Sequence, residues 1–139
     1  MTFETNQAQQ DWLERFITEH GGAAGTVHVQ RDEDLYLTAA HNIPPPVIAI
    51  VARVPHGKGM AGLAQVKKAP VQTCNLQTDA TGNIKPGAKA VDAQAAIALP
   101  VFDTAGAVRA VVGIAWSKED EIEPDREQTL MKRAAELPQ

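Results

Sequence analysis

The sequence has little cysteine, few aromatic residues and no extended basic region. Of its 139 residues one is cysteine, Cys74, and 4% are aromatic. A single cysteine forms no internal disulfide and no cysteine-based zinc cage, so we expect a reducing, cytoplasmic environment. The 13 Lys and Arg against 17 Asp and Glu leave Lys67-Lys68 as the one basic cluster. This balance argues against a nucleic-acid partner.

A hydrophobic run of membrane-spanning length is also missing. The longest, Pro44–Ala52, is too short to cross a bilayer, and residues 1–7 carry no secretion-signal pattern, so we expect no membrane partner. The 44% of hydrophobic and 22% of charged residues are typical of a folded globular protein. The length predicts one domain over residues 1–139, without a separate output domain, acting in trans or as a piece of a longer regulator.

The first segment has the periodicity of an amphipathic helix. From about Asn6 to His20, apolar residues recur at spacings of three and four, Thr5 or Asn6 can cap the start, and Gly21-Gly22 can end the helix. The stripe consists of Ala8, Trp12, Leu13, Phe16 and Ile17. It either packs on its own domain or also forms a dimer face, and both interpretations stay open.

Two hairpins are expected. Gly25–Gln30 and Leu35–Ala40 alternate, with Val27, Val29, Leu35, Leu37 and Ala39 inward. Ala95–Phe102 and Val108–Trp116 are almost continuously apolar, which indicates central strands covered on both faces, and Trp116 is interpreted as a packing residue. The histidines His20, His28, His41 and His56 are all expected in turns or on outward strand positions.

Short elements and a long loop separate these hairpins. We expect short helices over Val47–Arg53 and Met60–Lys67, a strand over Pro70–Cys74, an irregular segment over Asn75–Asp92, and a last helix over Glu123–Leu137. The glycines of Gly57–Gly62 lack the Lys-Ser/Thr of a P-loop, so they indicate a tight turn that allows close helix packing. The order predicts an α+β sandwich with an antiparallel sheet, terminal helices on one face and short helices with the long loop on the other.

Three stretches together resemble a GAF domain, the small-molecule-sensing domain of signalling proteins. They are Val54-Pro-His-Gly-Lys-Gly-Met-Ala-Gly-Leu-Ala, Ala69-Pro-Val-Gln-Thr-Cys-Asn-Leu-Gln-Thr-Asp, and Ala95–Phe102 with the following Asp103-Thr-Ala-Gly-Ala-Val-Arg-Ala-Val-Val-Gly-Ile. The resemblance covers about residues 22–137, with the segment 5–20 as an N-terminal helix. It implies the PAS/GAF/profilin-type sandwich.

The resemblance also implies a ligand pocket between the sheet and the long-loop side. The matching pocket candidates are Cys74, Asn75, Gln77, Asp79, Val91, Asp92, Ile97 and Leu99. Relatives often carry an aspartate where Asn75 stands.

Subfamily chemistry is tested by the residues that each subfamily needs. GAF-type methionine sulfoxide reductases need an attacking and a resolving thiol, and Cys74 alone supplies one. Cyclic-nucleotide relatives carry an Asn-Lys, Phe and Asp-Glu signature that Asn83, Lys85 and Phe102 echo at a different spacing. Bilin attachment needs a cysteine usually followed by His, whereas Asn75 follows Cys74. No cofactor is assigned and no catalytic or metal-binding residue is predicted.

Three functions remain. The first is a non-catalytic ligand-sensing domain for an unidentified small molecule, working as a homodimer through its terminal helices. The second is a thiol-dependent free methionine sulfoxide reductase that uses Cys74 with an external thiol. The third is a dimerisation module with a vestigial pocket. Cys74 itself is interpreted as a buried small hydrophobe or as a redox-sensing thiol.

Overall fold

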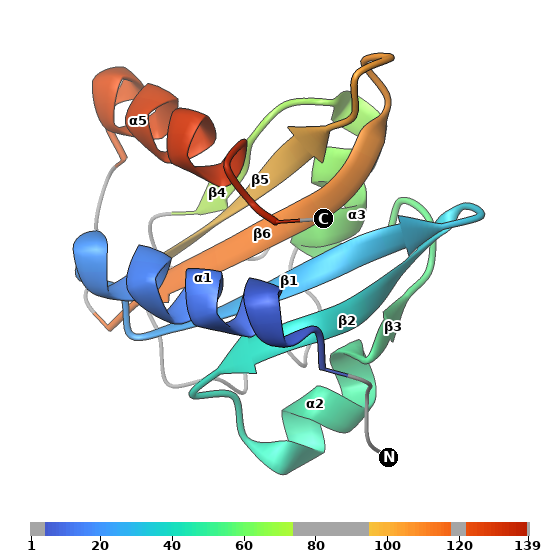
Figure 1. Cartoon of the computed structure of the whole chain (residues 1–139), viewed down its shortest axis with the longest axis horizontal. Helices are drawn as coiled ribbons and strands as arrows, with labels where there is room; N and C mark the ends of the chain where they lie inside the picture. Colours follow the sequence, from blue (N-terminus) through green and yellow to red (C-terminus); the bar gives the residue numbers. More distant parts are fainter. Residues whose placement is uncertain (1–4, 74–94, 118–121, 139) are drawn as a thin grey trace.

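The computed structural model describes residues 5–73, 95–117 and 122–138 (Figure 1). The strands form one six-stranded antiparallel sheet in the order β3-β2-β1-β6-β5-β4. They are β1 Ala24–Arg31, β2 Asp34–His41, β3 Arg53–Val54, β4 Val71–Thr73, β5 Ala95–Phe102 and β6 Val108–Trp116. The described helices are α1 Gln7–Glu19, α2 Pro45–Val51, α3 Gly59–Lys67 and α5 Pro124–Ala134. The predicted α+β sandwich is confirmed.

The two terminal helices cover one face of the sheet, while α3 lies behind it (Figure 1). Arg133 on α5 donates from Nε and Nη2 to the two carboxylate oxygens of Glu19 on α1, at 2.8 and 3.0 Å. This hydrogen-bonded pair holds the pKa of Glu19 below its usual range. The arrangement of the terminal helices on a common face agrees with the sequence prediction.

The large apolar side chains of the sheet point toward α1 and α5. Ile97, Leu99, Val112 and Ile114 join one buried cluster with the stripe of α1. The stripe itself, from Trp12 to Ile17, is at most 3% exposed, so it packs on its own domain. Burial of such side chains is the main stabilising contribution to a fold of this size.

The predicted stripe of α1 needs one correction. Ala8 is exposed, and Gln9 is buried in its place. The amide of Gln9 donates from Nε2 to the carbonyl of Pro138 at 2.9 Å and accepts a hydrogen bond from Thr38 Oγ1. A buried amide with both ends paired is tolerated in a core, and here it joins the N-terminal helix to β2 and the C-terminal tail.

Strand β2 carries a bulge. Val27 pairs with Ala39, but the next residue, His28, pairs with Leu37, which leaves Thr38 as the extra residue of β2. Leu35, Leu37 and Ala39 are all buried as predicted. Because of the bulge, Ala39 belongs to the cluster on the α1 face and Leu35 to the cluster on the α3 face.

The short elements differ from their predicted bounds. Helix α2 begins at Pro45 and ends at Val51. Arg53–Val54 form strand β3, an edge strand that the sequence pattern does not predict. Helix α3 begins one residue before the predicted Met60. Among the described residues, no helix is long and apolar enough to cross a membrane.

Candidate functional site

Small residues leave a hollow on the α2–α3 face of the sheet. Because side chains alternate along a strand, every second residue of β1, β6 and β5 points to this face. Two adjacent rows across these strands form the floor, namely Ala24–Ala115–Ala96 and Thr26–Gly113–Ala98. The next positions along β6 and β5, Val111 and Pro100, are larger.

Helix α2 and the start of α3 form the walls of a cavity above this floor. Val47 and Val51 of α2, Val54 of β3, and Met60 and Ala61 of α3 line it. The cavity has a volume of about 170 Å³. An apolar protein cavity of about 150 Å³ holds benzene, so this one has room for a compact organic molecule.

His28 is the buried titratable residue of the lining. It is 4% exposed, and its Nε2 lies 2.8 Å from the carbonyl oxygen of Val51. Because a carbonyl only accepts, Nε2 carries the proton and Nδ1 presents a lone pair. Burial lowers the pKa of His28 to about 4, against the opposing effect of the Val51 carbonyl, so the ring is neutral at pH 7.

The sequence prediction for His28 was therefore wrong. It was expected at a turn or outward strand position, whereas it is buried beneath α2. The physical reason is that the sheet is covered on both faces, so a position that alternates away from the α1 side still points into a second layer. His41 and His20 are half-buried, and His56 is exposed.

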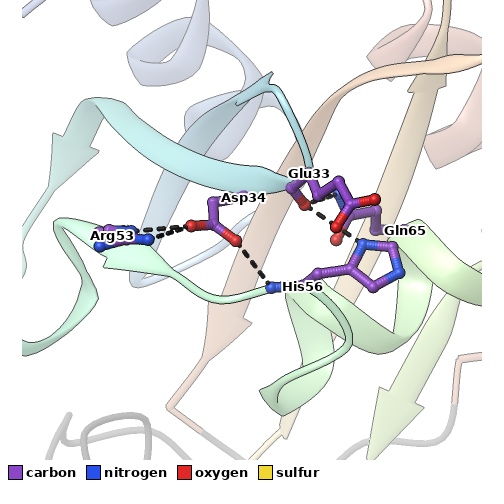
Figure 2. Close-up of polar contacts among 5 residues, drawn as sticks. All are labelled: Glu33, Asp34, Arg53, His56 and Gln65. Atoms are coloured by element: carbon purple, nitrogen blue, oxygen red, sulfur yellow. Dashed lines mark hydrogen bonds and ion pairs between the residues drawn. The ribbon is translucent and has the colours of Figure 1, made fainter.

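The turn before α3 is held at a fixed distance from the sheet. Figure 2 shows Asp34 of β2 between the side chain of Arg53 and the backbone of His56. Arg53 Nε donates to Asp34 Oδ2 at 2.8 Å, and the His56 N–H donates to Asp34 Oδ1 at 3.2 Å. These contacts hold the pKa of the Asp34 carboxyl below its usual range, chiefly through Arg53.

A second set of contacts joins α3 to the β1–β2 turn (Figure 2). The carbonyl of Glu33 accepts hydrogen bonds from Gln65 Nε2 at 2.8 Å and from the His56 ring at 3.2 Å. Together with the contacts of Asp34, these hydrogen bonds hold in place the segment that carries Lys58 and Gly59, which line the cavity.

Close packing of glycines completes this wall. A Cβ on Gly62 would lie 2.6 Å from the backbone carbon of Gly57, so only glycine permits the approach of α3 to its preceding turn. Gly57 and Gly59 have positive φ angles of 75° and 64°. The predicted tight turn is thus confirmed.

The predicted pocket residues fall into two groups. Cys74, Asn75, Gln77, Asp79, Val91 and Asp92 lie outside the described residues. Ile97 borders the cavity while belonging to the cluster beneath α1, and Leu99 belongs to that cluster without lining the cavity. Their role in ligand binding stays a prediction.

Several lining residues were missed. Thr26, His28 and Lys58 are the lining residues with polar side chains among those the structure describes. The signal that could have found the floor is the alternation of small residues in apolar strands, at Ala96 and Ala98 and again at Gly113 and Ala115. In residues 5–73, 95–117 and 122–138, no three His, Cys, Asp or Glu side chains group as a metal site.

The family follows from the comparisons. A GAF domain family model matches residues 5–137. The chain therefore belongs to the GAF domain family, as its sequence resemblance indicated. GAF domains are common small-molecule-binding regulatory domains. None of the curated proteins compared with the chain matches it.

Solved structures show the same fold. A GAF domain of an Acinetobacter phosphoenolpyruvate-protein phosphotransferase has a TM-score of 0.77 at 13% identity, covering 98% of this chain and 81% of that one. A type II free methionine-R-sulfoxide reductase from Thermoplasma acidophilum has a TM-score of 0.74 at 17% identity, covering 94% and 89%. At such identities the likeness establishes the fold alone.

Proposed function

We propose that this chain is a ligand-sensing GAF domain that holds a small organic molecule in the cavity between the sheet and helices α2 and α3. The observation that carries the proposal is the cavity of about 170 Å³ over two rows of small residues. A concave apolar surface with few polar groups is the usual character of a small-molecule site. The bound state is passed to a partner chain or to further segments of a larger regulator.

Contacts across the cavity support the sensing role. Helix α2 meets the sheet through buried Val47 and through the hydrogen bond that His28 Nε2 donates to the Val51 carbonyl. Ile50 of the same helix is 59% exposed. A ligand on the floor touches α2 and the start of α3 at once. Binding is therefore expected to bias the position of α2, because a ligand shifts a conformation only through differential contacts.

The proposed ligand site is tested by a substitution that fills the cavity with a larger side chain. Ala96→Leu adds three carbons on the floor, and Ala8→Leu adds the same group on the exposed surface of α1 as the matched control. Toluene is titrated into each protein, and methyl resonances of Val51 and Met60 are followed by NMR. We expect saturable shifts in the parent protein and in Ala8→Leu, and their loss in Ala96→Leu.

Two outcomes would overturn the proposal. One is the absence of saturable shifts in the parent protein, and the other is equal binding by Ala96→Leu. The alternative, a thiol-dependent sulfoxide reductase, is tested with free methionine-R-sulfoxide and dithiothreitol. Turnover that disappears in Cys74→Ser would replace the sensing role with an enzymatic one.

The homodimer through the terminal helices remains a prediction. The apolar stripe of α1 is buried in the core of its own domain. A partner that binds α1 from outside would therefore meet the polar surface around Glu14 and Arg15. Sedimentation velocity over a hundredfold concentration range tests this assembly. A purely monomeric protein would contradict it.

A further inference from the structure

The cavity is polarised at one end by the start of α3. Lys58, the N-cap residue, makes no side-chain capping bond, and the first backbone bond of the helix is from the Gly62 N–H to the Lys58 carbonyl. The N–H groups of Gly59, Met60 and Ala61 consequently have no acceptor within the helix. All three residues line the cavity beside Lys58.

This end of the cavity favours an anion. The free N–H groups of a helix start carry a partial positive charge, and the Lys58 ammonium adds a full one. Lys58 is the one charged side chain among the described lining residues, and it forms no ion pair within the described part of the chain. A bound carboxylate would meet both groups.

His28 supplies a second and independent polar contact. His28 is 4% exposed and lines the same cavity, and its Nε2–H donates a hydrogen bond to the Val51 carbonyl. Its Nδ1 makes no hydrogen bond to any described residue. A neutral ring held in this tautomer accepts at Nδ1, so it selects a ligand that carries an O–H or N–H donor.

The remaining lining limits the rest of the ligand. The floor of Ala96, Ala98, Gly113 and Ala115 is apolar and leaves about 170 Å³. That volume suits roughly six to eight non-hydrogen atoms besides the carboxylate group, judged from the benzene-binding cavity of similar size. An ammonium group would be repelled by Lys58 and the helix start, so a hydroxyl is the favoured donor.

Building on the proposed function, we infer that the cavity binds a small aliphatic hydroxy acid in its anionic form. The carboxylate lies at the N-terminus of α3 beside Lys58, the hydroxyl donates to Nδ1 of His28, and the aliphatic body covers the floor of small residues. The inferred ligand thus has a negative charge, a hydroxyl that donates a hydrogen bond, and a body small enough for the cavity.

The test uses three matched probes. They are 2-hydroxy-4-methylpentanoate, its primary amide, which lacks the charge, and 4-methylpentanoate, which lacks the hydroxyl. NMR titration of the parent protein gives a dissociation constant for each. We expect the hydroxy acid to bind about fivefold more tightly than its amide. It should also bind about fivefold more tightly than the acid without the hydroxyl, since one net hydrogen bond is lost.

A variant pair locates the charge. Lys58→Met keeps an apolar stem and is expected to reduce the preference for the acid over the amide, leaving only the part that the N-terminus of α3 supplies. Lys67→Met, at the other end of α3 and outside the cavity lining, should retain it. The hydroxyl comparison is made in the parent protein, so it does not depend on the folding of a His28 variant.

The outcomes separate this inference from the proposed function. If toluene binds but the acid shows no advantage over the amide, or Lys58→Met retains that advantage in full, the hydroxy-acid inference is wrong and the ligand site stands. Equal affinity of 4-methylpentanoate would remove the role of His28. Failure of every probe, toluene included, would remove the proposed function itself.

Discussion

The side chain of His28 crosses from β1 to the last turn of α2, where its Nε2 lies 2.8 Å from the carbonyl oxygen of Val51. This hydrogen bond joins the floor of the cavity to the helix above it. It also decides which ring nitrogen remains available to a ligand. A single buried side chain thus links the stability of the wall to the chemistry of the site.

The first prediction concerns pH. The pKa of His28 is lowered from 6.5 to about 4 in the folded protein. The unfolded chain therefore takes up this proton first as pH falls. Above pH 6.5 His28 is neutral in both states, and the folded protein has its full stability. Between pH 6.5 and about 4, protonation of His28 in the unfolded chain lowers the unfolding free energy by about 3 kcal/mol.

Urea denaturation of the parent protein and His28→Gln at several pH values checks this loss. The variant lacks the titrating ring, so its unfolding free energy should fall less between pH 6.5 and 4. Parallel curves for the two proteins would contradict the assignment of this loss to His28.

The second prediction concerns Gly62 in α3. Glycine to alanine in a helix usually stabilises by about 1 kcal/mol. Here the new Cβ would lie 2.6 Å from the Gly57 carbon and 3.0 Å from its Cα, both backbone atoms. Gly62→Ala is expected to cost about 2 kcal/mol and to weaken toluene binding, because the displaced turn lines the cavity. Thermal and urea unfolding measure the first effect, and a variant as stable as the parent would contradict it.

A third prediction tests the buried Gln9. Gln9→Leu leaves Thr38 Oγ1 and the Pro138 carbonyl without this partner, at a cost of about 2 kcal/mol. Adding Thr38→Val removes the hydroxyl that Gln9→Leu leaves without its partner. The double variant should therefore lose less unfolding free energy than the sum of the losses in the two single variants. A double-mutant cycle in urea measures this coupling. Additive losses would show that the two side chains act independently.

The fourth prediction separates the two contacts of Asp34. Asp34→Asn retains an oxygen for the His56 N–H but loses the charge that pairs with Arg53, whereas Asp34→Ala loses both. The His56 amide should exchange with solvent several-fold faster in Asp34→Ala and near the parent rate in Asp34→Asn. Hydrogen exchange followed by NMR distinguishes them. Equal exchange in the two variants would assign the protection to other contacts of the turn.

Local patterns predicted most of the fold. The spacing of Trp12, Leu13, Phe16 and Ile17 predicted α1 and its buried stripe, and the apolar runs around Asp103–Gly106 predicted the β5–β6 hairpin. Strand β3 was missed, because two residues carry no periodicity and their pairing depends on Leu35 and Tyr36 of β2. The bulge at Thr38 was missed for a similar reason, since a register shift is a property of two paired strands.

Less of the candidate site than of the fold could be predicted from the sequence. The described part of the cavity is built from β1, β3, β5, β6, α2, α3 and the segments beside them. Among these, β1 alone contains two of the polar side chains, Thr26 and His28. The small residues of β5 and β6 were interpreted as strand core. Their meaning as a floor depends on the register that aligns Ala96 with Ala115 and Ala98 with Gly113.

The sequence by itself determined the α+β class, the GAF family resemblance and the helices with clear caps, because these depend on short-range periodicity and chain order. Only the tertiary structure decided that His28 is buried and neutral, that Lys58 stands at a cavity, and that the floor is hollow. Burial, pKa and cavity volume are set by neighbours that are distant in sequence, and the pattern of one strand does not show how closely the elements over its second face pack.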